Sequence, residues 1–289
     1  MTQLMTDADL AGRLAVITGG GDGIGQALAH RLTGVGCHVA FCDISDTGIP
    51  RTIAMCEADA PAGTRITGHR CDVSDETQLK RFRDELLAAH ETDHVNLVFL
   101  NAGIAGGGSM ITAARDEWEK TFSVCWNGVY LGTRVFLPLL IAAEWGRIVT
   151  TSSVNGFFAS LGPTHPHTAY SAAKFAVKGF TEALITDLAV NAPHVGASVV
   201  MPGHIGTGIA ANTLSTHGAD ITAEMAGFAK AFREGAPTTS ASAADIIMDG
   251  VLAGQWRILV GDDAHKLDAE VRANPEAAYD PAFAIRLIE

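Results

Sequence analysis

The sequence predicts an α/β domain built on a doubly wound parallel sheet of about seven strands, with helices on both faces in three layers. Short apolar runs alternate along the chain with longer segments that have the amphipathic spacing of helices. Several of the runs are apolar throughout, as in strands of a parallel sheet buried on both faces. We find no internal repeat and no composition shift, so residues 1–289 are predicted to form a single domain.

The elements follow one another in a regular order. Strands are predicted at residues 14–18, 39–43, 66–72, 97–101, 147–152, 197–201 and 257–260, and helices at 24–35, 76–90, 116–143, 168–190 and 243–253. The strand runs are rich in β-formers, and the helical segments carry helix formers with an apolar face. Because crossovers between parallel strands are nearly always right-handed, this alternation predicts helices on both faces of one sheet.

Two regions depart from this rhythm. Residues 204–237 lie between a strand and a helix and contain four apolar residues at helical spacing, Ile221, Met225, Phe228 and Phe232. We interpret this segment as a lid over a substrate, with simple packing on the body of the protein as an equal alternative. Residues 262–289 form a C-terminal extension beyond the last strand, to which the sequence assigns no role.

Composition restricts the classes of function. Hydrophobic residues make up 47% of the chain, enough for a large core, and 20 basic against 32 acidic residues give a net charge of −12. An acidic surface repels nucleic-acid phosphates and anionic lipids, so neither nucleic acid nor membrane is an expected partner. No stretch of about 18 apolar residues is expected to span a membrane. The polar, acidic N-terminus does not resemble a signal peptide.

Cysteine usage indicates a reducing compartment. The five cysteines are odd in number and include no CxxC pair, so we expect buried, reduced thiols in a cytoplasmic protein. Histidines His165, His167 and His204 lie near the expected substrate mouth, as substrate contacts or as exposed loop residues. Their spacing, without a carboxylate or cysteine partner, predicts no metal site.

A glycine-rich turn joins the first strand to the first helix. It comprises Gly19, Gly20, Gly21, Asp22, Gly23, Ile24 and Gly25. Gly19 permits a tight exit from the strand, Gly23 permits close approach of a pyrophosphate, and Gly25 permits close packing of the helix on the sheet. The helix N-terminus supplies unpaired N–H groups and the positive end of a dipole. This Rossmann-type arrangement predicts dinucleotide binding.

Asp43 at the end of the second strand favours NAD over NADP. A carboxylate in this place accepts hydrogen bonds from the ribose hydroxyls and repels a 2′-phosphate. No arginine or lysine is adjacent to it in the sequence, and Asp22 adds a second negative charge nearby. The alternative is that Asp43 only caps the following turn.

Four motifs in register with the strands resemble the short-chain dehydrogenase/reductase family over residues 10–261. They are Thr18-Gly19-x-x-x-Gly23-x-Gly25, Asn101-Ala102-Gly103, Tyr170-x-x-x-Lys174 and Pro202-Gly203. The resemblance implies adenine contacts from Asp72 and Val73, and a groove-closing role for Asn101, Ala102 and Gly103. It also implies cofactor contacts from Tyr170, Lys174, Pro202 and Gly203, and nicotinamide contacts from Ile205 and Thr207. It further implies a homodimer or homotetramer formed through the helices near 116–143 and 168–190.

The resemblance identifies Asn127, Ser153, Tyr170 and Lys174 as catalytic. Oxidation of an alcohol needs a base for the hydroxyl proton, and a tyrosine with its ordinary pKa near 10 is too weakly ionised at neutral pH. Tyr170 and Lys174 are one helical turn apart on one face. An ammonium about 4 Å away supplies roughly 4 kcal/mol, enough to lower the tyrosine pKa by about three units. Ser153 would stabilise the substrate oxygen, and Asn127 would hold a water that connects Lys174 to solvent.

The region before Tyr170 departs from the family pattern. Ser153 and Tyr170 are 17 residues apart, a longer spacing than is common in the family. The additional length lies within residues 157–168, where Phe157, Phe158 and Leu161 add apolar surface to the expected substrate mouth. The longer spacing leaves Ser152 as an alternative to Ser153.

These observations predict an oxidoreductase that transfers a hydride between NAD(H) and a secondary alcohol or ketone. The substrate is expected to be small and mostly apolar. The alternatives are an NADP-dependent carbonyl reductase on the same scaffold, a non-catalytic dinucleotide-binding regulator, and dehydration or epimerisation chemistry. No additional acid/base pair in the sequence supports the last of these.

Overall fold

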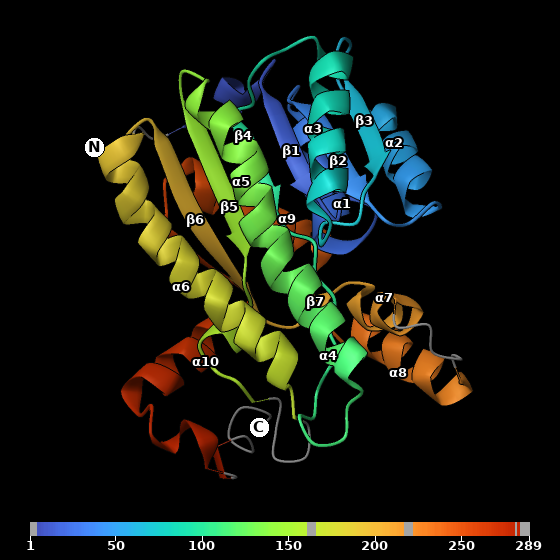
Figure 1. Cartoon of the computed structure of the whole chain (residues 1–289), viewed down its shortest axis with the longest axis vertical. Helices are drawn as coiled ribbons and strands as arrows, with labels where there is room; N and C mark the ends of the chain where they lie inside the picture. Colours follow the sequence, from blue (N-terminus) through green and yellow to red (C-terminus); the bar gives the residue numbers. More distant parts are fainter. Residues whose placement is uncertain (1–4, 161–165, 217–221, 281, 284–289) are drawn as a thin grey trace.

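Seven parallel strands form one sheet in the order β3-β2-β1-β4-β5-β6-β9 (Figure 1). The structure is a computed structural model that describes residues 5–160, 166–216, 222–280 and 282–283. The strands are β1 (Leu14–Thr18), β2 (His38–Asp43), β3 (Ile66–Arg70), β4 (Leu97–Leu100), β5 (Gly146–Thr151), β6 (Val195–Pro202) and β9 (Arg257–Val260). All neighbouring pairs in this sheet are parallel, which confirms the predicted α/β fold and strand number.

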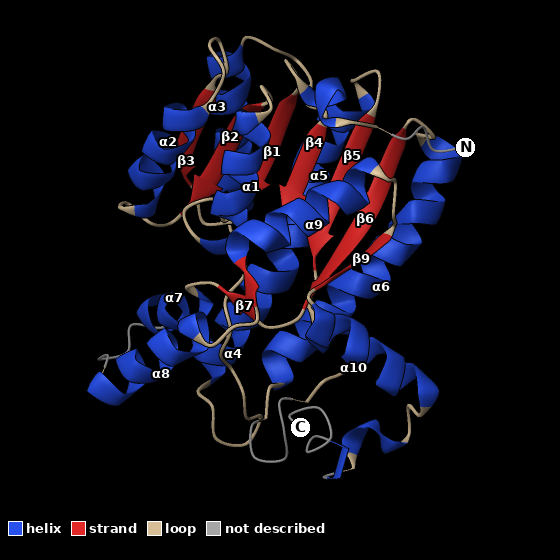
Figure 2. Ribbon diagram, turned by 180° about the vertical axis from the view of Figure 1, so that it is seen from behind, coloured by secondary structure: helices blue, strands red, loops and turns tan. Residues whose placement is uncertain are grey.

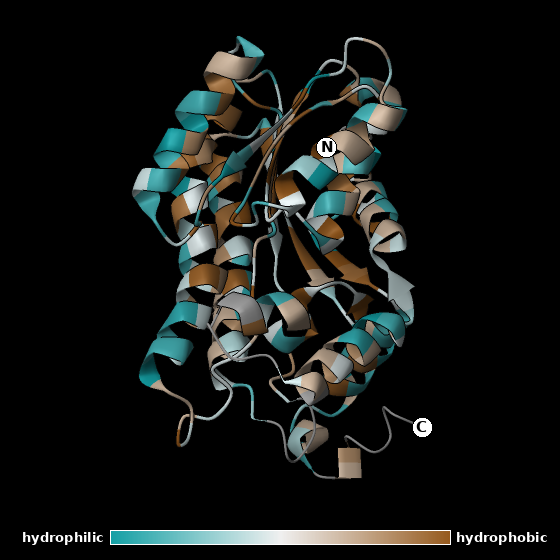
Figure 3. Ribbon diagram, turned by 90° about the vertical axis from the view of Figure 1, so that its right-hand side faces the viewer, coloured by the Kyte–Doolittle hydropathy of each residue, from teal (hydrophilic) through white to brown (hydrophobic). Residues whose placement is uncertain are grey.

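Helices cover both faces of the sheet (Figure 2). One face carries α1 (Gly23–Gly34), α2 (Gly48–Asp59) and α9 (Ser240–Leu252), and the other carries α3 (Glu76–His90), α5 (Gly128–Ile141) and α6 (Thr168–Asn191). Alternate residues of β1 serve the two layers. Ala15 and Ile17 join the core under the first set, whereas Leu14 and Val16 join the core under the second. The most hydrophobic ribbon accordingly lies between the layers (Figure 3).

Helix α2 is absent from the sequence-based prediction. Its segment starts at Gly48 and contains Pro50, which weakened the helical signal although proline is tolerated in the first helical turn. The apolar residues Ile49, Ile53 and Cys56 nevertheless recur at helical spacing and pack on the sheet. This omission matters because α2 lies next to the glycine turn.

The long helix predicted at residues 116–143 has an internal π-helical turn. It runs as α4 (Arg115–Phe122), the π-helical segment η2 (Ser123–Asn127) and α5. By length and composition, Arg115–Ile141 could cross a membrane, contrary to the sequence expectation that no such stretch exists. Half of its apolar window is buried in the fold, and α5 packs on α3, β4 and β5 as a core helix does.

The irregular segments gather beyond the carboxyl ends of the strands (Figures 1 and 2). Residues 204–237 contain β7 (Ile205–Gly206), α7 (Ile209–Thr216) and α8 (Ala223–Glu234), and β7 pairs with β8 (Thr238–Thr239). The C-terminal extension contains α10 (Asp262–Ala273) and the short 3₁₀ turn η4 (Ala277–Tyr279). Ligands of doubly wound sheets bind at this edge.

Candidate active site

The glycine positions of the turn between β1 and α1 have no room for side chains. Gly19 and Gly23 have positive φ values of 71° and 58°, which glycine adopts without strain. A Cβ atom on Gly25 would collide with the carbonyl oxygen of Gly19, so helix α1 packs directly on the exit from β1. Because α1 begins at Gly23, the N–H groups of its first turn have no partner within the helix. This cradle fits a dinucleotide pyrophosphate.

Asp43 lies beside this cradle at the end of β2. Its Oδ2 accepts a hydrogen bond from the N–H of Gly21 at 2.8 Å, and its Oδ1 accepts one from the N–H of Ser45 at 2.9 Å. The carboxylate is therefore oriented by two backbone donors, with lone pairs left for ribose hydroxyls. Asp43 can therefore cap the turn at Ser45 and still accept hydrogen bonds from the ribose hydroxyls of a dinucleotide.

Two arginines, Arg70 and Arg51, lie near Asp43 in the folded chain. No arginine or lysine is adjacent to Asp43 in the sequence, but the fold brings these two close. Arg70 of β3 is in register with Asp43 and pairs with Asp46 at 3.0 Å. Arg51 of α2 donates to the carbonyl oxygen of Gly21 at 2.8 Å and lies 3.5 Å from Asp22. Recognition of α2 as a helix would have pointed to Arg51.

The segment Asn101-Ala102-Gly103 connects the ends of three strands. The Thr18 hydroxyl of β1 accepts hydrogen bonds from the N–H groups of Asn101 and Ala102, at 3.0 and 3.1 Å. The Asn101 amide donates to the Thr18 carbonyl oxygen at 3.2 Å, and the Thr151 hydroxyl of β5 donates to the Asn101 side-chain oxygen at 3.5 Å. A Cβ on Gly103 would lie 3.4 Å from the Lys174 Nζ, so this segment borders the candidate catalytic groups.

Asp72 and Val73 follow β3 as the sequence indicates. The Asp72 carboxylate accepts hydrogen bonds from Lys120 Nζ of α4 at 2.8 Å and from the Ser74 hydroxyl at 2.6 Å. Burial raises the pKa of Asp72, but these donors outweigh it and hold the pKa below its ordinary value. Val73 packs against Gly128 of α5. Ser74 also donates its N–H to Asp72 Oδ1 at 2.9 Å, so Oδ1 is occupied by Ser74, whereas Oδ2 keeps a lone pair beside Lys120.

Ser153, Tyr170 and Lys174 come together where β5 ends and α6 begins. The Ser153 hydroxyl faces Tyr170 and lowers its pKa, and the Lys174 ammonium lies 5.3 Å from the centre of the Tyr170 ring. Lys174 is only 2% exposed and donates to the carbonyl oxygen of Thr151 at 2.8 Å. The predicted placement of Tyr170 and Lys174 on one helix face is confirmed.

The Ser152 hydroxyl is used differently. It donates to the carbonyl oxygen of Lys174 at 2.7 Å and is almost fully buried. A Cβ on Gly156 would collide with its oxygen, so this serine is enclosed by the backbone. Ser153 instead caps the short 3₁₀ turn η3 (Val154–Gly156), and its hydroxyl accepts from the N–H of Asn155 at 3.1 Å. Only Ser153 therefore presents its hydroxyl to Tyr170.

The protein by itself does not lower the pKa of Tyr170. Burial raises that pKa, the neighbouring Cys125 raises it further, and the Ser153 hydrogen bond lowers it only in part. Burial also lowers the pKa of Lys174. Without a bound dinucleotide the pKa of Tyr170 is therefore raised, which is opposite to the direction expected from the Lys174 ammonium.

Asn127 and Cys125 lie on the π-helical turn η2, which contacts α6. The Asn127 amide donates to the Ser123 hydroxyl at 3.1 Å, and the Cys125 thiol donates to the Ile104 carbonyl oxygen at 3.1 Å. Turns of this kind are frequent at functional sites. Cys125 adjoins Lys174 and Tyr170, a proximity that its position in the sequence did not indicate. All five cysteines are free and buried, as expected.

Two of the three histidines near the mouth can be placed. The His167 ring is 4.7 Å from the Tyr170 ring, and burial lowers the pKa of His167 to about 4. His204 hydrogen bonds through Nε2 to the Phe232 carbonyl oxygen at 2.7 Å, so it joins α8 to the end of β6. His165 lies outside the described residues. Among the described residues, no cluster of three metal-ligating side chains occurs.

The segment after Pro202 lies on the glycine turn. A Cβ on Gly23 would be 3.0 Å from the Thr207 side chain, and Asn212 of α7 donates to Asp22 at 3.3 Å. Ile205 is buried within the small β7–β8 sheet. Thr207, one of the two residues that the resemblance assigned to the nicotinamide, therefore lies against the glycine turn.

The predicted apolar stripe of residues 204–237 is only partly packed on the body of the protein. Phe228 is 65% exposed, and Phe232 contacts His204 with ring centres 4.2 Å apart. Ile221 lies outside the described residues. Phe158, expected to add surface to the substrate mouth, is only 5% exposed and is buried against the C-terminal extension, whereas Leu161 is not described.

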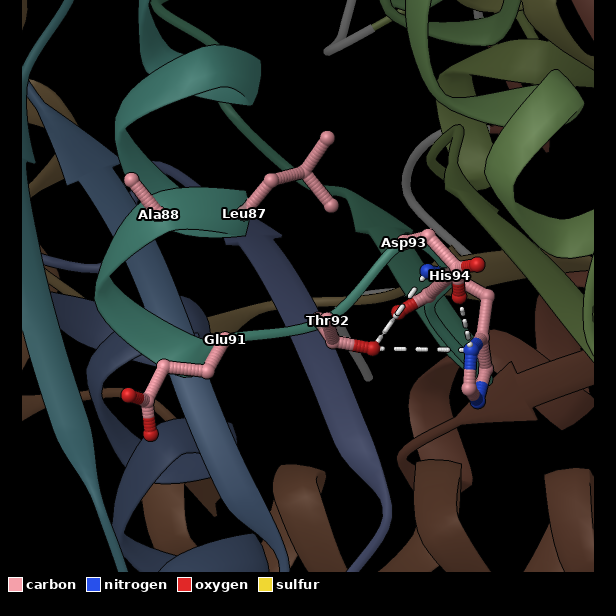
Figure 4. A pocket seen from close by; sticks show the side chains of 6 residues that line it. All are labelled: Leu87, Ala88, Glu91, Thr92, Asp93 and His94. Carbon is pink, nitrogen blue, oxygen red and sulfur yellow. Dashed lines mark hydrogen bonds and ion pairs between the residues drawn. The ribbon is translucent and has the colours of Figure 1, made fainter.

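A hollow away from these residues occurs at the turn between α3 and β4 (Figure 4). Its polar groups bond to one another, since His94 pairs with Asp93 at 2.8 Å and with the Thr92 hydroxyl at 3.4 Å. A second hollow lies between α9 and β9. The first adjoins the amino end of β4, at the sheet edge opposite Tyr170, and carries no catalytic group.

Comparison with known proteins decides the family. Residues 13–218 match the family model described as short chain dehydrogenase. The chain belongs to the short-chain dehydrogenase/reductase family. It is 37% identical over 262 residues to SadH of Mycobacterium tuberculosis, a protein named as an oxidoreductase, with 90% of each chain covered.

Two solved members of the short-chain dehydrogenase/reductase family share this fold with a bound dinucleotide. The Burkholderia phymatum protein in complex with NAD has a TM-score of 0.80 and 29% identity, and covers 93% of this chain and 94% of its own. A metagenomic short-chain oxidoreductase in complex with NADP has a TM-score of 0.65 and 26% identity, and covers 87% and 97%. The family uses nicotinamide dinucleotides, and its relatives are oxidoreductases.

Proposed function

We propose that this protein is an NAD-dependent dehydrogenase/reductase of a secondary alcohol and its ketone. The observation that carries the proposal is the convergence of Ser153, Tyr170 and Lys174 at the carboxyl edge of the sheet. A non-catalytic regulator needs the glycine cradle but not this buried group. A mostly apolar, small substrate is the class we propose.

The residues have distinct tasks in the proposed reaction. When bound, the nicotinamide supplies the hydride acceptor and, in its oxidised form, a positive charge that stabilises a phenolate at Tyr170. Tyr170 takes the proton of the substrate hydroxyl during oxidation and returns it to the oxygen during reduction. Ser153 donates a hydrogen bond to that oxygen. Lys174 holds positive charge near the phenol, and Asn127 is proposed to order a water that completes the proton path.

The dinucleotide is proposed to lie between the glycine turn and residues 202–207. Gly19, Gly21, Asp22, Gly23, Ile24 and Gly25 would surround the pyrophosphate, and Asp43 would bind the adenosine ribose. The preference for NAD is supported by the two backbone donors that orient the Asp43 carboxylate toward this side. NADP-dependent reduction is the alternative, favoured by the nearby Arg51.

A spectrophotometric screen tests the function. Wild-type protein should change absorbance at 340 nm with NAD and apolar secondary alcohols, or with NADH and their ketones. Tyr170→Phe should lower kcat by about 10²-fold or more, since general acid–base catalysis contributes that factor, while NADH binding followed by fluorescence stays nearly unchanged. Turnover of charged sugars alone would contradict the substrate class. Equal inactivity of wild type and variant across the panel would favour the regulator.

We also propose that the protein is a homodimer or homotetramer that pairs through α5 and α6. Large apolar side chains are exposed there, Tyr130 and Ile141 on α5 and Phe175 on α6, each more than 40% exposed. Light scattering of the purified protein would measure the assembly, and a monomeric mass would contradict this proposal. Cytoplasmic location stays a prediction.

A further inference from the structure

The C-terminal extension contacts two of the loops that carry candidate active-site residues, those after β5 and after β6. α10 follows β9 directly, and α10 and η4 lie beyond the carboxyl ends of the strands (Figures 1 and 2). The sequence alone assigns this segment no role. Its contacts form three groups, at its beginning, its middle and its end.

The beginning of the extension holds the loop after β6. The Asp263 carboxylate accepts a hydrogen bond from the N–H of His204 at 2.6 Å. A Cβ on Gly203 would collide with the same carboxylate, so only glycine permits this approach. The Pro202-Gly203 segment is thereby tied to the first turn of α10.

The middle of the extension is fixed to the sheet by a buried ion pair. Asp268 of α10 pairs with Arg257 of β9, with both side chains 13% exposed. One bond of the pair, from Arg257 Nη1 to Asp268 Oδ2, measures 3.0 Å, and Arg272 adds contacts of 3.0 Å. The bidentate geometry fixes the direction in which α10 leaves the sheet.

The end of the extension encloses Phe158 of the loop after β5. Tyr279 stacks on the Phe158 ring at 5.6 Å and Phe283 packs on it at 5.5 Å, while Leu267 and Val271 of α10 border the cluster. The Tyr279 hydroxyl also accepts from the N–H of Ala159 at 3.1 Å. Phe158 and Phe283 are 5% and 6% exposed. Aromatic contacts of this kind are geometrically specific.

Phe158 is connected to Ser153 by short hydrogen bonds. Its N–H donates to the Val154 carbonyl oxygen at 3.0 Å, and its carbonyl oxygen accepts from the Asn155 amide at 2.9 Å. The N–H of Asn155 then donates to the Ser153 hydroxyl oxygen at 3.1 Å. Asn155 is 4% exposed. A displacement of Phe158 would therefore move Asn155 and, through it, the Ser153 hydroxyl that faces Tyr170.

We propose that Tyr279 and Phe283 are positioning residues that hold Ser153 in its reactive orientation through Phe158 and Asn155. The proposal rests on the proposed function, in which Ser153 hydrogen bonds to the substrate oxygen. The end of the extension thus supports the substrate side of the site, whereas its beginning, at Asp263, holds the Pro202-Gly203 segment on the dinucleotide side.

The test compares Tyr279→Ala and Phe283→Ala with the conservative variant Tyr279→Phe and with Glu276→Ala, a change at an exposed residue of the same segment. The probes are 1-phenylethanol and 2-octanol with NAD. Each alanine variant should lower kcat about 10- to 100-fold, the effect of a small misplacement at a reactive centre. The affinity for NADH should stay within about twofold of the wild-type value, because the loop that carries Ser153 is not proposed to bind the dinucleotide. Tyr279→Phe should restore most of the rate, because it keeps the stacked ring.

Amide hydrogen exchange provides a second readout that needs no turnover. Exchange in residues 154–159 should accelerate in the alanine variants, whereas exchange in residues 19–25 should not change. Unchanged exchange in residues 154–159, or equal acceleration throughout the chain, would overturn the proposal. If the wild type oxidises none of the probes or the wider panel, the proposed function fails, and the exchange result still decides whether the extension holds the Ser153 loop.

Discussion

Ser152 and Ser153 are adjacent in the sequence, yet their hydroxyl groups have different partners. One donates into the backbone of α6 and the other faces Tyr170. Sequence spacing could not choose between them, because the choice depends on how Gly156 allows the chain to wrap around Ser152. The sequence motif therefore locates the pair of serines, and only the three-dimensional contacts show which of the two hydroxyl groups faces Tyr170.

Alanine substitutions should separate the two serines. Ser153→Ala should lower kcat by about 10²- to 10³-fold, the usual effect of removing a donor to a developing oxyanion. Ser152→Ala should retain most activity and reduce the free energy of unfolding by about 1 kcal/mol, the net contribution of one hydrogen bond. Steady-state kinetics and urea unfolding of both variants would check this. The reverse pattern would assign catalysis to Ser152.

Asp43 and Arg51 should control the choice of dinucleotide together. Asp43→Asn should weaken NADH binding by about 10-fold or more, as expected for loss of charge-assisted hydrogen bonds. It should strengthen NADPH binding, because the carboxylate no longer repels the 2′-phosphate. Adding Arg51→Ala should remove the gain for NADPH while it leaves NADH nearly unchanged. Parallel fluorescence titrations of the wild type and both variants would measure all six affinities, and tighter NADPH than NADH binding by the wild type would contradict the assignment of Asp43.

At the scale of elements, the strand runs and four of the helices were predictable because each buries a regular apolar pattern. Helix α2 was not, since Gly48 and Pro50 obscured its start, and its absence concealed Arg51. The π-helical turn at Ser123–Asn127 has no hydropathy signal. The role of the C-terminal extension could not be predicted, because its aromatic residues contact Phe158 from about 120 residues further along the chain. The hydrogen bond between Ala159 and Tyr279 illustrates this separation.

The Asp268–Arg257 pair should decide how firmly α10 is attached. Asp268→Asn removes the charge that faces two arginines and leaves the Arg257 guanidinium partly buried without a counter-charge, which costs about 3 kcal/mol. Urea unfolding would measure the loss. Glu270→Gln, an exposed change on the same helix, is the matched control and should be neutral. Equal stability of Asp268→Asn and wild type would show that the pair does not anchor the extension.

For the whole molecule, the fold gathers the proposed function at one end of the sheet. The carboxyl ends of the strands hold the glycine cradle, the Ser153 group and the extension. Another polar cluster surrounds the edge strand β3 and comprises His38 at the start of β2, His69 of β3 and His90 at the end of α3, with Arg65 and Glu85 beside them. This second cluster has no place in the proposed chemistry, so its consequences should be seen in stability.

Stability should fall as the pH decreases from about 6.5 to about 4. His90 is 6% exposed, its Nδ1 has no partner within the described residues, and burial together with His38, Arg65 and His69 lowers its pKa to about 4. Because the folded pKa lies below the ordinary value of 6.5, the unfolded chain binds the proton more readily through this interval. The contribution of neutral His90 is therefore complete above pH 6.5 and decreases by up to about 3 kcal/mol as the pH approaches 4.

Urea unfolding at pH 7.5, 6.5, 5.5 and 4.5 in wild type and His90→Gln would measure this dependence. Glutamine keeps a polar group near the Thr67 hydroxyl, which hydrogen bonds to His90 Nε2 at 3.0 Å, but does not titrate. The variant should start less stable and show a shallower decline than the wild type over these pH values. His167 contributes a decline of the same sign, since burial lowers its pKa to about 4 as well, so the slope should not vanish. Parallel curves for the two proteins would mean that His90 does not drive the acid sensitivity of the fold.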